Sequence, residues 1–185
     1  MFKEVFIQRV DGDDTTPILA NAATPLRYKH IFGDDLLTKF ANAKTTDENG
    51  SERYQIDFLG ELAFVMAMQA AALTDKSIKL EKLNPDKFID WLEQYEGMAI
   101  ENAAEDILNV YLGNVGGSSE AKKKQRRTER ELNSALFYLR CFQMGIRTDD
   151  LEKIDYGFVL DMMVESGNDE YKYKEMASQE DFDAF

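Results

Sequence analysis

Apart from its first twenty residues, the chain places its large apolar side chains at helical spacing, with short polar breaks between the segments. Residues 2–10 are instead rich in β-formers, and the following Asp11-Gly12-Asp13-Asp14 is strong turn chemistry. We therefore expect a β-hairpin that returns through Ile18 and Leu19. The predicted fold class is mainly α: an N-terminal hairpin followed by a helical domain, a flexible linker and a small helical C-terminal module.

Four helical segments are predicted before the linker from apolar spacing, proline positions and glycine stops. The last two are separated by Gly97, and the third opens at Asn84-Pro85 as N-cap and first helical position. The segments are residues 26–43 with an interruption at Gly33, a central helix from residue 51 to about residue 73, residues 85–96, and an amphipathic segment at residues 98–112.

A glycine-rich and then lysine-rich stretch divides the chain into two unequal parts. The predicted boundaries are residues 1–112 for a helical domain with the hairpin, residues 113–125 for the linker, and residues 126–185 for a C-terminal extension. In the extension a helix over residues 126–144 places Leu132, Leu136, Leu139 and Phe142 with Ala135 on one side and stops at Gly145. A second helix, capped by Asp155, runs to Gly167, and an acidic, aromatic tail follows.

The net charge and the cysteine content indicate which kinds of partner to exclude and in which cellular compartment to expect the protein. The 185 residues carry a net charge of −13, distributed as −9 over residues 1–112, +4 over residues 113–130 and −8 over residues 131–185. Most of the surface should therefore repel phosphate, which argues against nucleic acid or an anionic membrane as the main partner. The lone Cys141 and the charged N-terminus favour a cytoplasmic protein. The longest nearly apolar run, residues 62–73, is too short to span a bilayer and predicts a buried helix.

The sequence offers no catalytic, metal or cofactor constellation, so we expect a protein that is not an enzyme. His30 is the only histidine, and Cys141 has no base nearby in sequence, which favours a small packed hydrophobe. The glycine-rich stretch lacks the Gly-Lys-Ser/Thr of a P-loop. Six Lys and Arg residues in 122–130 lack interleaved aromatic residues for base stacking, so a solvated helix start is favoured over nucleic-acid binding.

Two groups of residues resemble a known family. The sequence Ala-Thr-Pro-Leu-Arg-Tyr at residues 23–28 with Ile-Phe-Gly-Asp-Asp-Leu-Leu at residues 31–37 resembles the N-terminal signature of tail assembly chaperones of long-tailed phages and prophages of Gram-positive bacteria. Residues 145–151, 157–163, 168–169 and 181–185 are similar to the downstream part of the longer form of these chaperones. The resemblance touches nearly the whole chain, and its motifs are packing and surface patterns.

The resemblance implies a mechanism without bond chemistry. Residues 1–112 would coat the tape measure protein, and residues 131–185 would recruit tail tube subunits, in the bacterial host cytoplasm and without entering the mature virion. Further expected partners are a short chaperone isoform and a homo-oligomer. In this family a long product arises by ribosomal frameshifting, and Lys122-Lys123-Lys124 must be encoded by an adenine-rich run on which a ribosome can slip. The alternative for these lysines is that they simply open a helix.

The candidate partner-binding residues are large apolar side chains of the last predicted helix and of the tail that follows it: Phe158, Met162, Met163, Phe182 and Phe185. An alternative function is that of an acidic protein-binding inhibitor or nucleic-acid mimic. Such a mimic would need its carboxylates spread over one continuous face and a basic target.

Overall fold

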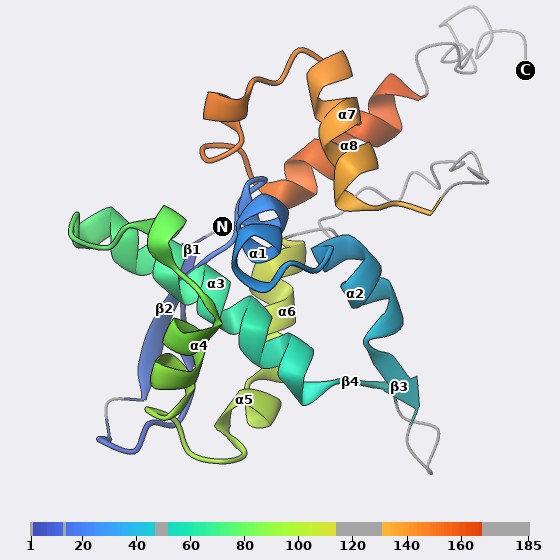
Figure 1. Cartoon of the computed structure of the whole chain (residues 1–185). Coiled ribbons are helices and arrows are strands. Elements are labelled where there is room, and N and C mark those ends of the chain that lie inside the picture. The colour runs from blue at the N-terminus through green and yellow to red at the C-terminus, as the bar shows by residue number, and fades with distance from the viewer. Residues whose placement is uncertain (1, 13, 47–51, 114–130, 168–185) are drawn as a thin grey trace, which may run out of the picture.

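The computed structural model describes residues 2–12, 14–46, 52–113 and 131–167, and Figure 1 shows their arrangement. The protein is mainly helical with an N-terminal two-stranded antiparallel hairpin, which confirms the predicted fold class. In chain order the elements are β1 (Phe2–Phe6), β2 (Thr15–Leu19), α1 (Thr24–Phe32), α2 (Leu36–Asn42), β3 (Lys44–Thr46), β4 (Glu52–Tyr54), α3 (Ile56–Thr74), η1 (Leu80–Lys82), α4 (Pro85–Leu92), α5 (Ala99–Asn102), α6 (Ala104–Leu112), α7 (Ser134–Gln143), η2 (Thr148–Asp150) and α8 (Tyr156–Ser166).

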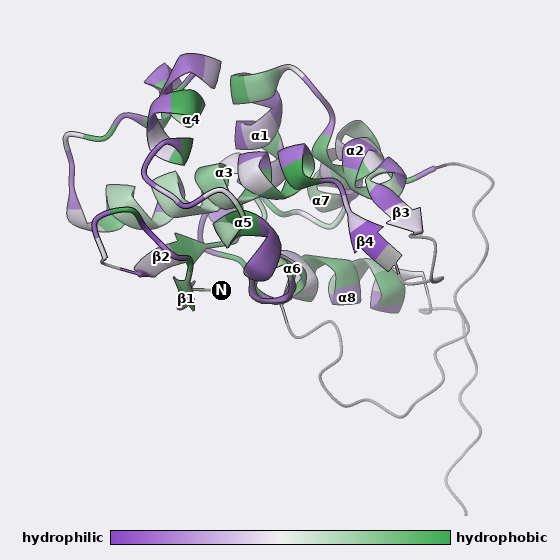
Figure 2. Ribbon diagram, turned by 90° about the horizontal axis from the view of Figure 1, so that it is seen from below, coloured by the Kyte–Doolittle hydropathy of each residue, from purple (hydrophilic) through white to green (hydrophobic). Residues whose placement is uncertain are grey.

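The N-terminal hairpin has one buried and one exposed face. β1 pairs with β2 so that Phe2 lies opposite Leu19 and Phe6 opposite Thr15. Val5 and Ile18 are buried against the helices, whereas Phe2 and Phe6 alternate with them and are exposed. This alternation follows from the period of two along a strand. The exposed face of β1 therefore carries Phe2 and Phe6 with Glu4 between them, and Figure 2 shows hydrophobic residues along β1.

Helix α3 forms the centre of the protein, with β2, α1, α4, α5 and α6 packed around it (Figure 1). Its buried Gln69 donates hydrogen bonds to the Leu19 carbonyl oxygen and to Thr24 Oγ1, so the one polar side chain inside this apolar helix is satisfied. Among the described residues α3 alone is long and apolar enough to cross a membrane, but 61% of it is buried inside the protein. Its burial makes α3 the core helix of this fold.

Three predicted helical segments in the first part of the chain have wrong bounds, and one of them is residues 85–96, where α4 ends at Leu92. The central helix begins at Ile56 and not at residue 51, because residues 52–54 pair with residues 44–46 as a short second hairpin in which Tyr54 lies opposite Lys44. The amphipathic segment 98–112 is two helices, α5 and α6, separated at Ala103. By contrast, the Gly33 break, the Asn84 cap on the Lys87 amide and the Gly145 stop are confirmed.

Helix α7 is shorter than predicted. It begins at Ser134, where Asn133 Oδ1 accepts a hydrogen bond from the Leu136 amide at 2.9 Å, and residues 131–133 precede it in non-helical conformation. An N-cap side chain fixes a helix start because it satisfies one of the otherwise unpaired first amides. The basic residues at 126–130 lie outside the described residues, as does all of the predicted linker except Gly113.

Helices α7 and α8 share one hydrophobic core with the first part of the chain. Phe137 and Tyr156 are buried in the same cluster as Tyr111, and the Tyr156 ring stacks on Tyr111 with centroids 5.0 Å apart. The Ala22 amide also donates a hydrogen bond to the Ile154 carbonyl oxygen at 3.0 Å. The division into residues 1–112 and 126–185 stays a prediction, but the described parts of both segments pack together.

Candidate partner-binding surface

Helix α7 carries apolar side chains on two opposite sides. Phe137 and Cys141 are fully buried, whereas Leu139 and Phe142 are 47% and 52% exposed. Ala135 lies in line with Leu139 and Phe142 along the exposed side, and all three follow the spacing of one helical stripe. A helix that is apolar on both sides is usually enclosed on both sides, so the outward stripe indicates a surface for another molecule.

Hydrogen bonds to distant residues fix which side of α7 faces the core. Asp35 Oδ2 accepts a hydrogen bond from the Ser134 amide at 2.9 Å, at the first residue of the helix. One turn later Tyr138 Oη accepts from the Leu26 amide at 2.9 Å and donates to the Ala22 carbonyl oxygen at 3.1 Å. These bonds hold the helix so that Leu139 and Phe142 point outward.

Asp35 serves two helices at once. Its Oδ1 accepts a hydrogen bond from the Thr38 amide at 3.0 Å and caps α2, while the same carboxylate meets Ser134 at the start of α7. Partial burial acts to raise the pKa of Asp35, but the hydrogen bonds from Thr38 and Ser134 outweigh it, and the pKa is lowered. The carboxylate is therefore the form that supports the α2–α7 contact.

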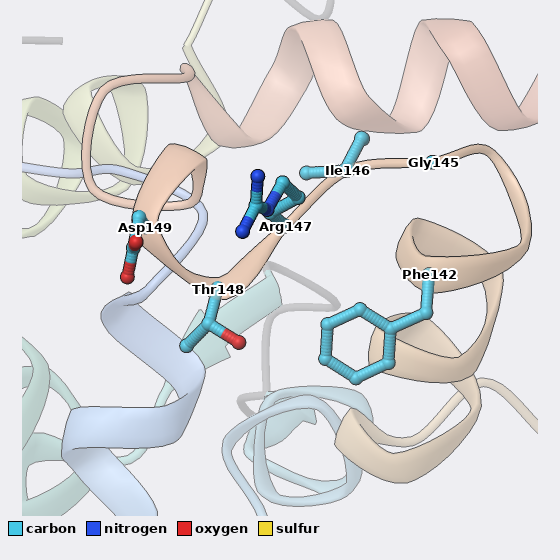
Figure 3. A pocket seen from close by; sticks show the side chains of 6 residues that line it. All are labelled: Phe142, Gly145, Ile146, Arg147, Thr148 and Asp149. Carbon is cyan, nitrogen blue, oxygen red and sulfur yellow. The ribbon is translucent and has the colours of Figure 1, made fainter.

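A surface hollow lies at the C-terminal end of the α7 stripe. It has a volume of about 440 Å³ and lies between Phe142 and the turn that leads into η2. Figure 3 shows the Phe142 ring extending toward Thr148 across the hollow. Arg147 precedes Thr148 along the same turn, and the Asp149 side chain points away. The hollow adjoins the apolar stripe at Phe142, and its other exposed lining side chains are the polar Arg147, Thr148 and Asp149.

Helix α8 adds a smaller exposed apolar site. Asp155 caps it by accepting a hydrogen bond from the Gly157 amide at 2.9 Å, and Tyr156 and Val159 are buried. The candidate residue Phe158 is 59% exposed. Met162 lies one turn further on the same side and is half-buried, as is Met163, which follows Val159 by one turn on the core side. The candidates Phe182 and Phe185 lie outside the described residues.

The sequence analysis placed Ala135, Leu139 and Phe142 on one side of α7, as the structure has them, but it was wrong to include Leu132 in the helix and it did not single out the stripe for binding. Leu132, which precedes the helix, is 42% exposed and Leu136 is partly buried. The sequence does contain a pattern that indicates such a stripe. Phe137 and Cys141 are one helical turn apart on one side, and Ala135, Leu139 and Phe142 recur at helical spacing on the other side, so the helix has two apolar sides. One side of such a helix must face away from its own core.

The described residues offer little to reaction chemistry. No group of three or more His, Cys, Asp and Glu residues within them is placed to hold a metal ion. Burial raises the pKa of the Cys141 thiol to about 11, which disfavours the nucleophilic thiolate. His30 Nε2 lies 3.0 Å from the Glu81 backbone oxygen, on the surface. The exposed groups that remain at this surface are the apolar side chains of α7 and α8 and the polar side chains at the hollow beside Phe142.

Comparison of the chain with protein-family models, with curated proteins and with solved structures finds no match in any of the three.

Proposed function

We propose that this protein is a tail assembly chaperone of a long-tailed phage or prophage, which coats the tape measure protein and recruits tail tube subunits. It acts in the bacterial host cytoplasm and is absent from the mature virion. The motifs at residues 23–28, 31–37 and 145–151 support this proposal by their resemblance to such chaperones. The outward apolar stripe of α7 is the structural observation that carries it.

The α7 stripe suits the recruiting role. Leu139 and Phe142 are each about half exposed, and burying the exposed halves would contribute roughly 1.5–3 kcal/mol. Association itself costs about 4 kcal/mol or more, so these two side chains are too few to hold a client alone and the recruiting surface needs further contacts. We assign recruitment of the tail tube protein to α7 together with Phe158 of α8.

The coating role falls to the first part of the chain. Phe2 and Phe6 lie on the exposed face of the hairpin, on a different element from the α7 stripe. A tape measure protein is a long helical chain whose apolar faces need cover before the tube polymerises around it, and such helices bind apolar surfaces. A single chaperone could then contact tape measure and tube protein at separate sites.

The test is co-purification of tagged chain with the tail tube protein and the tape measure protein encoded beside its gene. Phe142→Glu places a charge in the stripe and should abolish capture of the tube protein while leaving capture of the tape measure protein. Ile89→Glu on α4 is the matched control, since Ile89 is also 52% exposed, and it should retain the tube protein.

Other outcomes would assign a different function. Capture of a basic DNA-binding protein by the full chain, with neither tail protein, would support the alternative of an acidic inhibitor or nucleic-acid mimic. Equal loss of the tube protein in both variants would refute the role of the α7 stripe.

The frameshift origin is tested separately through the coding DNA. Synonymous changes that break the adenine run encoding residues 122–124 should abolish a full-length product and leave a shorter one that carries the same N-terminal tag. A full-length product that survives these changes would refute recoding while leaving the chaperone proposal intact.

A further inference from the structure

A second hollow, which we call the α1–η1 groove, lies on a different part of the surface from the α7 stripe. It has a volume of about 610 Å³ and is formed by α1, the end of α3, residues 76–81 and Glu152. In Figure 1 the segment after α3 turns back toward α1, and η1 contacts both helices. The groove thus joins segments that are far apart in the sequence.

The groove combines apolar and cationic side chains. Leu26, Ile78 and Leu80 supply apolar surface, and the Leu26 side chain is 47% exposed. Lys76 and Lys79 are exposed along the same hollow. Such a lining suits a ligand that carries both carboxylates and large apolar groups.

Neither Lys76 nor Lys79 forms an ion pair within the described residues, although Glu81 lines the same groove. Arg27, which also lines the groove, is paired with Glu152. The lining as a whole carries Arg27, Lys76 and Lys79 against Glu81 and Glu152, so with His30 neutral its net charge is +1 in a chain with a net charge of −13. An acidic segment that reached the groove would be attracted to the two lysines.

We propose that the α1–η1 groove binds the acidic, aromatic segment at residues 175–185 of the same chain. This segment contains four Asp and Glu residues and no Lys or Arg, so its charge is opposite to that of Lys76 and Lys79. Phe182 and Phe185 provide the large apolar groups that fit beside Leu26 and Leu80. Both halves of the groove lining are thereby matched by one short sequence.

The length of chain after α8 is sufficient for this contact. Glu152, at the groove, lies four residues before α8, and the 11 residues of α8 rise about 16 Å, so Gly167 is at most roughly 30–35 Å from the groove. The fifteen residues from Gly167 to Phe182 span up to about 50 Å when extended. Because the segment belongs to the same chain, its contact with the groove would be intramolecular, which raises its effective concentration there.

Occupation of the groove by the segment would control access to two surfaces. It would cover the apolar side chains of the groove and would hold Phe182 and Phe185, which are candidate partner-binding residues, away from other proteins. A partner that binds either surface would have to displace the intramolecular contact.

The test measures anisotropy of a fluorescently labelled peptide of residues 175–185 on adding full-length chains. Full-length chain with Phe182→Ala and Phe185→Ala should bind the peptide at least tenfold more tightly than the wild-type chain, because its own tail no longer competes. Adding Lys76→Glu and Lys79→Glu to that chain should abolish binding. The control chain carries Phe182→Ala and Phe185→Ala with Lys3→Glu and Lys44→Glu in place of the two groove substitutions. It has the same net charge, changed outside the groove, and it should bind the peptide as tightly as the chain with the phenylalanine substitutions alone.

Three results would overturn the proposal. The first is equal affinity of the wild-type and the Phe182→Ala, Phe185→Ala chains for the peptide. The second is binding that persists after Lys76→Glu and Lys79→Glu, with Trp91 fluorescence showing that the core is intact. The third is a wild-type dimer in sedimentation that the two phenylalanine substitutions dissociate, since the groove would then bind the tail of a second copy.

Discussion

Replacing Phe137 tests whether the C-terminal helices are part of the same folding unit as the rest of the protein. Phe137 is fully buried on α7, and its ring lies 5.1 Å from that of Tyr156 and 5.2 Å from that of Tyr138, measured between centroids. Truncation of a buried phenylalanine to alanine removes its transfer free energy and leaves a cavity. We expect Phe137→Ala to lower the free energy of unfolding by about 3–5 kcal/mol.

Trp91 provides a local reporter at a distance from this change. It is the only tryptophan of the chain, is 6% exposed on α4, and its ring contacts are with Phe64 and Tyr95. If the shared core unfolds as one unit, Trp91 fluorescence and far-UV circular dichroism should give the same transition. At a urea dependence of about 2 kcal/mol/M, the midpoint of both should fall by roughly 1.5–2.5 M.

Phe142→Ala is the matched control, since it removes the same atoms from the other side of the same helix. Phe142 is 52% exposed, so we expect the free energy of unfolding to change by less than about 1 kcal/mol. The reasoning is refuted if Phe137→Ala leaves the Trp91 transition unchanged while circular dichroism shows earlier loss of part of the helix. That result would mean that α7 and α8 unfold separately from the rest of the protein.

Three further substitutions or treatments have defined outcomes in urea or labelling experiments. Asp35→Ala should cost about 1 kcal/mol at pH 7 through loss of its hydrogen bonds to Thr38 and Ser134. Because the pKa of Asp35 is lowered on folding, the difference from wild type should be present above about pH 4 and shrink as the pH falls below it. Gly145→Ala should cost about 1–2 kcal/mol, because φ is +82° while a Cβ there meets no atom within 4 Å, so that a measured cost near zero would contradict the backbone argument. Cys141, with a buried thiol whose pKa is raised to about 11, should react with a thiol reagent at pH 8 only after unfolding by denaturant.

Local chemistry made several elements of this fold predictable. The hairpin follows from β-formers around a turn, and the Gly33 and Gly145 stops adopt the left-handed conformation that glycine tolerates best. Asn84 caps α4 as its position before proline predicts. In each case the residues that decide the structure are neighbours in sequence, so a short pattern carries the information.

Other features depend on contacts that no local pattern reveals. The side of α7 that faces the core is set by Asp35, which is 99 residues from Ser134, and by Leu26, which is 112 residues from Tyr138. The second hairpin was also missed, because Tyr54 continues the apolar spacing of α3 and only pairing with residues 44–46 makes it a strand. Sequence therefore indicated that α7 has an apolar stripe, but only the fold shows that this stripe faces outward.

The same dependence on long-range contacts applies to the candidate binding residues. Phe158 is exposed, and Met162 lies on its side of α8, whereas Met163 lies on the core side. The two sides can be told apart only once Tyr156 and Val159 are known to face inward. The α1–η1 groove could not be predicted at all, since Leu26, Lys79 and Glu152 come together only through tertiary packing.

The packing of α7 and α8 against Tyr111 and the segment around Ala22 bears on the proposed frameshift, which would yield a short and a long product. A product ending near residue 113 would lack Phe137, Cys141, Tyr156 and Val159, all of them buried in the full chain. The surface that these side chains cover would then be open, and the Ala22 amide and carbonyl would lose their partners on Ile154 and Tyr138. The short and long products would therefore be two different binding proteins, because the longer one occupies with its own helices a site that the shorter one leaves for other molecules.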